Sequence, residues 1–186
     1  MPDKHRFINY SCAGADVATR GRSFGLDIRR ESEAITKAHT EVVRVAAISL
    51  FSYVIKGTPV GNPDLWLVKL ADGTYGDYIA NRGYPAGYTG GTARASWNLT
   101  NGASSYEPTG KTDAASETAN NVIRELGSKA YTGVFTLASG LPYIERLEDG
   151  WSTQAPAGMV KTSIPITESK IPQIKAAAYR KDGVRP

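Results

Sequence analysis

The feature that most constrains the fold is a stretch from residue 26 to residue 56 that contains neither glycine nor proline. Within it, apolar residues recur at spacings of three and four, as they do along one face of an amphipathic helix. They form one stripe with a second row beside it: Ile35, Val42, Ala46, Leu50 and Val54, then Val43, Ala47 and Phe51. The pattern predicts a long helix over residues 27–56, with Asp27 as its N-cap and Gly57 and Pro59 ending it. The stripe is wide enough to face a sheet rather than a coiled-coil partner.

The chain has 186 residues, a length that suits one domain and is short for two. Glycine and proline number 19 and 10, which indicates a loop-rich protein. A single cysteine, Cys12, excludes an internal disulfide and a cysteine zinc site. The two histidines, His5 and His39, leave little material for a metal centre or a proton relay. We therefore expect no cofactor, no metal site and no enzymatic activity.

The segments on either side of the helix are irregular. Glycines at 14, 21 and 25 interrupt residues 1–25, which we expect to form an arm that orders only against a neighbour. A single domain should span residues 26–182, with a loop-rich insertion at about 61–91 and a short tail at 183–186. Within the insertion, residues 65–70 and 75–80 should pair about the Asp72-Gly73 turn. Residues 83–91 should form a flexible loop that exposes Tyr84 and Tyr88.

The rest of the chain alternates between short strands and helices. Strands are predicted over residues 93–100, 131–138 and 160–166, the last with Pro165 at an edge or bulge. Helices are predicted from Thr112 or Asp113 to about residue 126, over residues 142–148, and from Pro172 to about residue 181. These elements predict an α+β fold: a long N-terminal helix packed on a small, mostly antiparallel β-sheet with one or two further helices.

Charge is concentrated at the two ends of the chain. Residues 1–30 carry six basic and three acidic side chains, and residues 170–186 carry five basic and one acidic, whereas the middle is slightly acidic. Basic ends are typical of segments that touch an acidic partner, so a DNA-binding accessory module is one alternative. No membrane contact is expected, because the most apolar stretch, residues 42–55, is short and is interrupted by Arg44, Ser49 and Ser52.

The tightest carboxylate cluster gives a second alternative. Glu145 and Glu148 are three residues apart, so they can share one face of a helix. Such a pair is conceivable as the acid and base of a cell-wall hydrolase. Carboxylates near the end of a helix more often bind backbone amides or arginines, and Arg146 lies between these two. We therefore favour a structural role for this cluster.

The most informative segment is residues 142–160, in which a short helix ends at Gly150 and is followed by Trp151 and a constrained Gln-Ala-Pro-Ala-Gly turn. A rigid surface turn that presents Trp151, Gln154 and Met159 suits a contact with another protein better than it suits a reaction.

This segment resembles a signature of the neck and tail-completion (tail terminator-like) proteins of tailed bacteriophages, Pro-Tyr-x-x-x-Leu-Glu-x-Gly-x-Ser-x-Gln-Ala-Pro-x-Gly-Met. The residues that match it are Pro142, Tyr143, Leu147, Glu148, Gly150, Ser152, Gln154, Ala155, Pro156, Gly158 and Met159. A weaker match to the same family lies upstream, where Pro59-Val60 is followed by Thr89-Gly90 and then by Arg94, Ser96 and Trp97. The chain departs from the family pattern in the long segment 62–88 and in one extra residue before Arg94.

The resemblance implies a virion structural protein at the head–tail junction of a phage, made in the host cytoplasm. It implies a ring, expected to be a hexamer, that completes or terminates the tail and contacts the head-closure or connector protein and the tail tube, with DNA passing through without sequence-specific binding. Trp151 and the matched residues from Tyr143 to Met159 are then expected at an assembly interface. Tyr84, Tyr88, Arg94 and Trp97 are expected in a loop that reaches a neighbouring ring.

Overall fold

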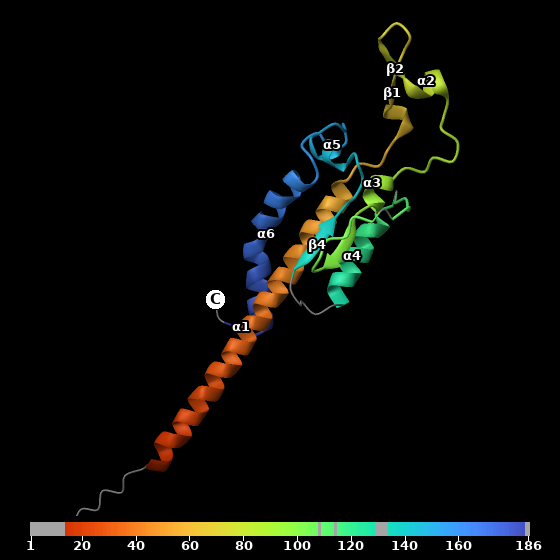
Figure 1. The fold of residues 1–186 in the computed structure, drawn as a ribbon. Coiled ribbons are helices and arrows are strands. Elements are labelled where there is room, and N and C mark those ends of the chain that lie inside the picture. The colour runs from red at the N-terminus through yellow and green to blue at the C-terminus, as the bar shows by residue number, and fades with distance from the viewer. Residues whose placement is uncertain (1–13, 108, 114, 129–133, 185–186) are drawn as a thin grey trace, which may run out of the picture.

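The structure is a computed structural model that describes residues 14–107, 109–113, 115–128 and 134–184, with side chains from residue 24 onward. It consists of a long N-terminal helix, several further helices and two small antiparallel sheets, which confirms the predicted α+β class. Figure 1 shows most of the other elements gathered around the C-terminal half of the long helix, with residues 63–82 beyond its end. The first part of the predicted arm, with His5 and Cys12, lies outside the described residues, as do residues 131–133 of a predicted strand and the last two residues of the tail.

The long helix, α1, spans Gly14–Gly57 and is therefore longer than predicted. Residues 14–24 are helical rather than irregular, and Asp27 lies inside the helix instead of capping it. An isolated glycine costs a helix about 1 kcal/mol but keeps its backbone N–H, so Gly21 and Gly25 weaken the helix without ending it. The predicted end at Gly57 is confirmed.

Two helices flank the C-terminal half of α1: α4 (Glu117–Ser128) and α6 (Val160–Lys181). The strand predicted over residues 160–166 is wrong, because these residues form the first two turns of α6 and Pro165 and Pro172 lie within it. The side chains of Ser163 and Thr167 donate hydrogen bonds to the carbonyl oxygens four residues earlier, at 2.6 and 2.9 Å. Both side chains are buried, and their small size fits a face packed closely on α1.

One sheet pairs β3 (Asn98–Asn101) with β4 (Phe135–Ala138), with Leu99 opposite Leu137. The first half of the strand predicted over 93–100 is instead a short helix, α3 (Thr92–Ala95). The main core joins these elements to α1 and α4. Its buried members are Val54, Ile55, Trp97, Ala119, Val122, Leu126, Ala155 and Met159.

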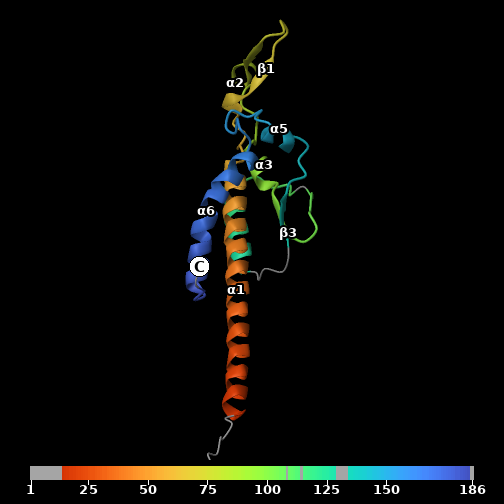
Figure 2. The ribbon, with the colours of Figure 1, turned by 90° about the vertical axis from the view of Figure 1, so that its left-hand side faces the viewer.

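The second sheet is the predicted hairpin, β1 (Leu67–Lys69) and β2 (Tyr75–Asp77), preceded by the 3-10 helix η1 (Pro63–Leu65). The side chain of Asp72 accepts hydrogen bonds from the backbone N–H and the hydroxyl of Thr74, which fixes the predicted turn. A short helix, α2 (Tyr78–Arg82), replaces the end of the predicted return strand. This unit projects beyond the C-terminal end of α1 in Figures 1 and 2.

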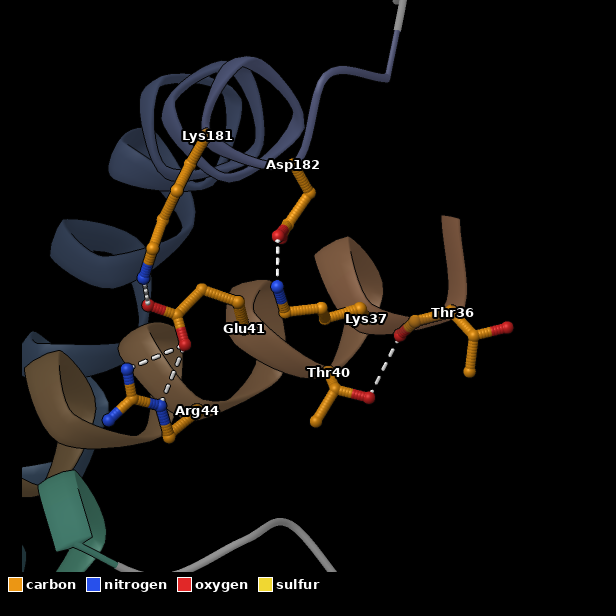
Figure 3. A network of polar contacts seen from close by, with 7 residues as sticks. All are labelled: Thr36, Lys37, Thr40, Glu41, Arg44, Lys181 and Asp182. Atoms are coloured by element: carbon orange, nitrogen blue, oxygen red, sulfur yellow. Dashed lines mark hydrogen bonds and ion pairs between the residues drawn. The ribbon is translucent and has the colours of Figure 1, made fainter. Parts of the chain in front are cut away.

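Polar contacts hold α6 and α4 to the middle of α1, and Figure 3 shows those between α1 and the end of α6. Lys37 pairs with Asp182 at 2.8 Å, and Lys181 pairs with Glu41 at 3.3 Å, so the C-terminal end of α6 is held to α1. Glu41 also accepts hydrogen bonds from the Arg44 guanidinium, which in turn donates to the Gly127 carbonyl oxygen at the end of α4. The network therefore ties three helices together at one level of α1.

Over Phe24–Gly57, α1 is long and apolar enough, by length and composition, to cross a membrane. Its most apolar window has a mean hydropathy of 1.3 and is 22% buried. Mostly buried core helices of soluble proteins and signal sequences meet the same criterion, so it is weak evidence for a membrane span. In the structure, α4 and α6 pack against the C-terminal half of α1.

Candidate functional site

The C-terminal end of α1 is a meeting point for residues far apart in the sequence. Arg94 donates hydrogen bonds to the carbonyl oxygens of Lys56 and Thr58 at 3.3 and 3.0 Å, and to the Ser116 hydroxyl at 3.1 Å. A guanidinium there satisfies carbonyl groups that the helix itself leaves unpaired and complements its dipole. Arg94 thus caps the C-terminal end of α1.

Trp97 reaches the same place from the core. Its indole Nε1–H donates to the Thr58 hydroxyl at 2.8 Å, and that hydroxyl donates to the Val54 carbonyl oxygen at 2.8 Å. Trp97 is only 9% exposed and Thr58 is fully buried. The expectation that Trp97 lies in an exposed loop that contacts a neighbouring ring is therefore wrong. Sequence reasoning missed Thr58, whose position directly after the predicted helix end was the available signal.

The Gln-Ala-Pro-Ala-Gly turn is joined to the same region by Gln154. Its side-chain Nε2 donates to the Val60 carbonyl oxygen at 2.8 Å, and its Oε1 accepts from the Val60 N–H at 3.2 Å. One carboxamide therefore pairs with both backbone groups of a residue 94 positions earlier. Ser152 supports the turn, because its hydroxyl accepts from the Gln154 N–H at 3.3 Å and its carbonyl oxygen accepts from the Ala155 N–H at 3.0 Å.

Glu148, at the end of α5 (Ile144–Glu148), caps the next helix along the chain. Its carboxylate accepts hydrogen bonds from the backbone N–H groups of Met159, Val160 and Lys161, at 2.8, 2.9 and 2.8 Å. These are donors that the start of α6 would otherwise leave unpaired. Burial alone would raise the pKa of the Glu148 carboxyl, but the three amides more than offset that effect and hold the pKa below its usual range.

Two glycines of the motif are required by this arrangement. Gly150 and Gly158 have φ values of +84° and +82°, a backbone conformation that residues with a side chain rarely adopt. A Cβ at Gly150 would collide with the carbonyl oxygen of Pro156, and one at Gly158 would lie 2.5 Å from the carbonyl oxygen of Glu148. The glycines therefore allow the end of α5 and the turn to pack backbone against backbone.

The motif divides into a buried half and an exposed half. Ala155 and Met159 are buried in the main core, and Leu147 packs against it. Tyr143 is 40% exposed, Trp151 is 75% exposed, and Pro156 is also exposed. The Arg146 guanidinium lies over the Trp151 ring, 5.3 Å from its centre. The buried residues and the cap fix the positions from which the aromatic side chains project.

The exposed half borders an open cleft of about 430 Å³ between the motif and the inserted hairpin unit. Four aromatic residues line it, together with Gln154 and the chain from Pro59 to Asn62: Trp66, Tyr88, Tyr143 and Trp151.

Tyr88 packs edge-on against Trp66 with ring centres 4.9 Å apart, so it is half-buried rather than presented by a flexible loop. Tyr84 is 60% exposed, as expected. Burial raises the pKa of both Tyr88 and Tyr143. Trp66 was not singled out in the sequence, because a lone tryptophan in a short strand gives no sign of facing a cleft.

The carboxylate pair does not have the arrangement of a hydrolytic site. Glu148 is occupied by three backbone amides, whereas Glu145 is exposed on α5. Among the described residues, no group of three or more histidine, cysteine or acidic side chains is placed to hold a metal ion. The arrangement supports binding through shape and aromatic contact.

Stability should fall at acidic pH because four carboxyl groups of the described residues, Glu41, Asp72, Asp113 and Glu148, have lowered pKa values in the fold. At Asp72 the hydrogen bonds from Thr74 lower the pKa. Arg44 lowers the pKa of Glu41, backbone amides lower that of Glu148, and amides with the Thr118 hydroxyl outweigh burial at Asp113. In the unfolded chain such groups titrate near pH 4, so the folded state binds fewer protons there. The contribution of these carboxyl groups to the free energy of unfolding should therefore be constant above about pH 6 and decrease as pH falls through about 4 and below.

Urea unfolding at pH 7 and pH 3.5 measures this effect, with Glu148→Gln as the comparison. The variant should lose less stability between the two pH values than the wild type, because it lacks one of the titrating groups. An equal or greater loss in the variant would contradict the role assigned to the Glu148 carboxylate.

Comparison of the chain with protein-family models, curated proteins and solved structures finds no match. The likeness to phage neck proteins therefore rests on the motif residues themselves.

Proposed function

We propose that this protein is a structural component of a phage virion at the head–tail junction. It forms a ring of identical subunits that completes or terminates the tail and joins it to the head-closure or connector protein. Its ring surrounds the channel through which DNA passes, and its chemistry is contact between proteins rather than catalysis.

One observation carries the proposal: the separate pieces of the family resemblance form one unit in space. The backbone of Val60, in the upstream piece, is hydrogen-bonded to the side chain of Gln154 in the C-terminal motif. The side chains of Arg94 and Trp97 both donate hydrogen bonds to Thr58, two residues before Val60. The unit also presents Tyr143 and Trp151 on a firmly held scaffold, and exposed aromatic residues are favoured anchors of protein interfaces.

The alternatives receive less support. A hydrolase using Glu145 and Glu148 would need Glu148 free for acid–base chemistry, whereas it caps α6. A DNA-binding module would rely on the basic ends of the chain, and in the C-terminal one Lys181 is paired with Glu41.

The test is imaging of the purified protein by negative-stain electron microscopy, alone and mixed with phage tail tubes. We expect annular particles, or density at one end of the tube. Protein that stays monomeric and attaches to neither tubes nor heads would contradict the proposal.

Trp151→Ala sharpens this test. Because the side chain is 75% exposed, the variant should unfold at the same urea concentration as the wild type yet attach to tubes or heads at least about tenfold less tightly. Tyr106→Ala, at a 63% exposed aromatic residue that does not line the cleft, is the matched control and should attach normally. Equal attachment of both variants would exclude the Trp151 surface as the contact.

A further inference from the structure

The unit formed by residues 63–82 projects beyond the C-terminal end of α1 (Figures 1 and 2). Its sheet has only two strands, β1 and β2, and α2 packs against both of them. The packing is close at Gly76, because a Cβ there would lie 3.0 Å from the side-chain nitrogen of Asn81. A two-stranded hairpin is marginally stable in water, and a packed helix or a third strand stabilises it. Here α2 covers one face of the hairpin, and no third strand is present among the described residues.

The hydrogen bonds of the hairpin show which backbone groups point away from it. Two bonds at 2.8 Å join the ends of the ladder, Tyr78 N–H to the Trp66 carbonyl oxygen and Leu70 N–H to the Thr74 carbonyl oxygen. In an antiparallel pair every second residue bonds the partner strand, so Val68 also faces β2. Leu67 and Lys69 lie between these positions, and their N–H and C=O groups therefore point outward. The outer edge of β1 thus carries two donors and two acceptors.

The outer edge of β2 is partly closed, whereas that of β1 is open. The Asp77 carbonyl oxygen accepts a hydrogen bond from the side-chain amide of Asn81 at 2.6 Å, and the Asp77 carboxylate accepts from the Ala80 N–H at 2.9 Å. Both contacts hold the start of α2 against the β2 edge. Within the described part of the chain, no hydrogen bond from outside the sheet reaches the backbone of Leu67 or Lys69. We call the outward backbone groups of these two residues the β1 edge.

The side chains at the β1 edge are exposed and differ in character. Leu67 is 67% exposed, and Lys69 is also exposed. They lie on the same face of the strand, because residues two apart point to the same side. Edge strands are usually protected by charges, prolines or a covering segment. Leu67 gives no such protection, and Lys69 favours a neighbouring strand that carries a negative charge.

We infer that the β1 edge binds an extended segment of a different protein as a third strand of the sheet. The inference rests on the proposed function, because the partner is then a head or tail protein beside the ring. An extended backbone presents donors and acceptors at the spacing of Leu67 and Lys69, and binding by strand addition is a recurring mode of peptide recognition. The segment carries an apolar residue beside Leu67 and an acidic residue beside Lys69, two positions apart, because neighbouring side chains on one face of a sheet contact each other.

The place of the β1 edge in the fold suits a contact with another protein. Leu65 and Trp66 line the open cleft together with Trp151, and β1 begins at the next residue, Leu67. The edge therefore continues the surface proposed as the contact. A second copy of this chain fits less well, because two β1 edges pairing antiparallel would place Leu67 of each copy beside Lys69 of the other. Such a two-fold contact joins two chains and does not close a ring.

Proline substitutions test the edge, because proline removes a backbone N–H donor. Lys69→Pro removes an outward N–H from β1 and leaves the bonds to β2 in place. Tyr75→Pro is the matched control, since Tyr75 lies opposite Lys69 and its N–H points outward from β2. Lys69→Glu keeps the N–H group and reverses the charge. Circular dichroism and urea unfolding show whether each variant is folded, and Lys69→Glu carries the test if a proline variant is not.

The probe is a fluorescein-labelled peptide of threonines in which a valine and a glutamate stand two positions apart. A second peptide, with lysine in place of glutamate, is its matched control, and fluorescence anisotropy measures Kd. We expect the wild type and Tyr75→Pro to bind the glutamate peptide at least about tenfold more tightly than Lys69→Pro does. Lys69→Glu should prefer the lysine peptide. Lys69→Pro should also attach to phage tail tubes or heads at least about tenfold less tightly than Tyr75→Pro.

The possible outcomes separate the inference from the proposed function. A wild type that binds neither peptide, or Lys69→Pro and Tyr75→Pro variants that bind the glutamate peptide equally, would overturn the inference and leave the proposed ring in place. Unchanged attachment of Lys69→Pro to tubes and heads would overturn the partner inferred here. A dimeric mass of the wild type that is lost in Lys69→Pro but not in Tyr75→Pro would assign the edge to a second copy, against the inference. A wild type that forms no rings and attaches to neither tubes nor heads would overturn the proposed function itself.

Discussion

Replacing Trp97 with alanine should lower the free energy of unfolding by about 4 kcal/mol, the range measured for removing a large aromatic side chain from a core. Trp97 is 9% exposed and packs in the main core with Val54 and Ile55. The variant loses that packing and also leaves the fully buried Thr58 hydroxyl without its indole donor. Because domains of this kind are stable by about 5–15 kcal/mol in total, the effect should be visible as a large shift in the urea midpoint.

Trp151→Ala is the internal control, since it removes the same side chain from a position that is 75% exposed. Its free energy of unfolding should lie within about 0.5 kcal/mol of that of the wild type. Trp97→Phe keeps one aromatic ring in the core but loses the N–H donor and the rest of the indole, so it should cost less than Trp97→Ala, about 2 kcal/mol. Equal stability of the Trp97→Ala and Trp151→Ala variants would contradict the core position of Trp97.

Local sequence signals predicted the elements whose ends are fixed by nearby residues. Gly57 ends α1, the Asp72-Gly73 turn joins β1 to β2, and Asp113 caps α4 by accepting from the N–H groups of Glu117 and Thr118 at 2.8 and 2.7 Å. In each case the residues that define the structure lie within five positions of one another, so the sequence alone contains the information.

Elements held by distant residues were mispredicted. The start of α6, residues 160–166, contains three branched apolar residues and Pro165, a pattern that predicts an edge strand. It is helical because Glu148, 12 positions before Val160, caps it and because α1 packs along it. A proline inside a helix costs about 3 kcal/mol, so local preference is overridden here by tertiary contacts.

The same distinction applies to the candidate site. The sequence singles out the segment from Tyr143 to Met159, but it does not predict which of its residues point into the core and which point to solvent. Trp151 and Met159 are both large and apolar, yet one is 75% exposed and the other 1%. Direction along an irregular turn depends on Gly150 and Gly158, whose positive φ values reverse the chain, and on the bonds of Gln154 to Val60. None of these follows from a periodic pattern.

Replacing Glu148 with alanine should lower the free energy of unfolding by about 3 kcal/mol. The variant leaves the backbone N–H groups of Met159, Val160 and Lys161 without their acceptor, and charge-assisted bonds of this kind contribute about 1.5–3 kcal/mol each before water replaces part of the loss. Lys161 is exposed, so water can reach its amide, whereas Met159 is 1% exposed and its amide is harder to rehydrate. Thermal unfolding followed by circular dichroism measures the difference.

Glu145→Ala is the matched control and separates stability from catalysis. Glu145 is exposed on the same helix, so its replacement should change stability by less than about 0.5 kcal/mol. A hydrolase that used both carboxylates would lose activity in both variants while keeping its fold in at least one. If instead Glu148→Ala unfolds as easily as the wild type and Glu145→Ala abolishes cleavage of cell-wall material, the cap assignment fails and the hydrolytic alternative gains the support that it now lacks. A loss of stability confined to Glu148→Ala would assign this carboxylate to the scaffold of the fold, where its three hydrogen bonds tie the end of α5 to the start of α6.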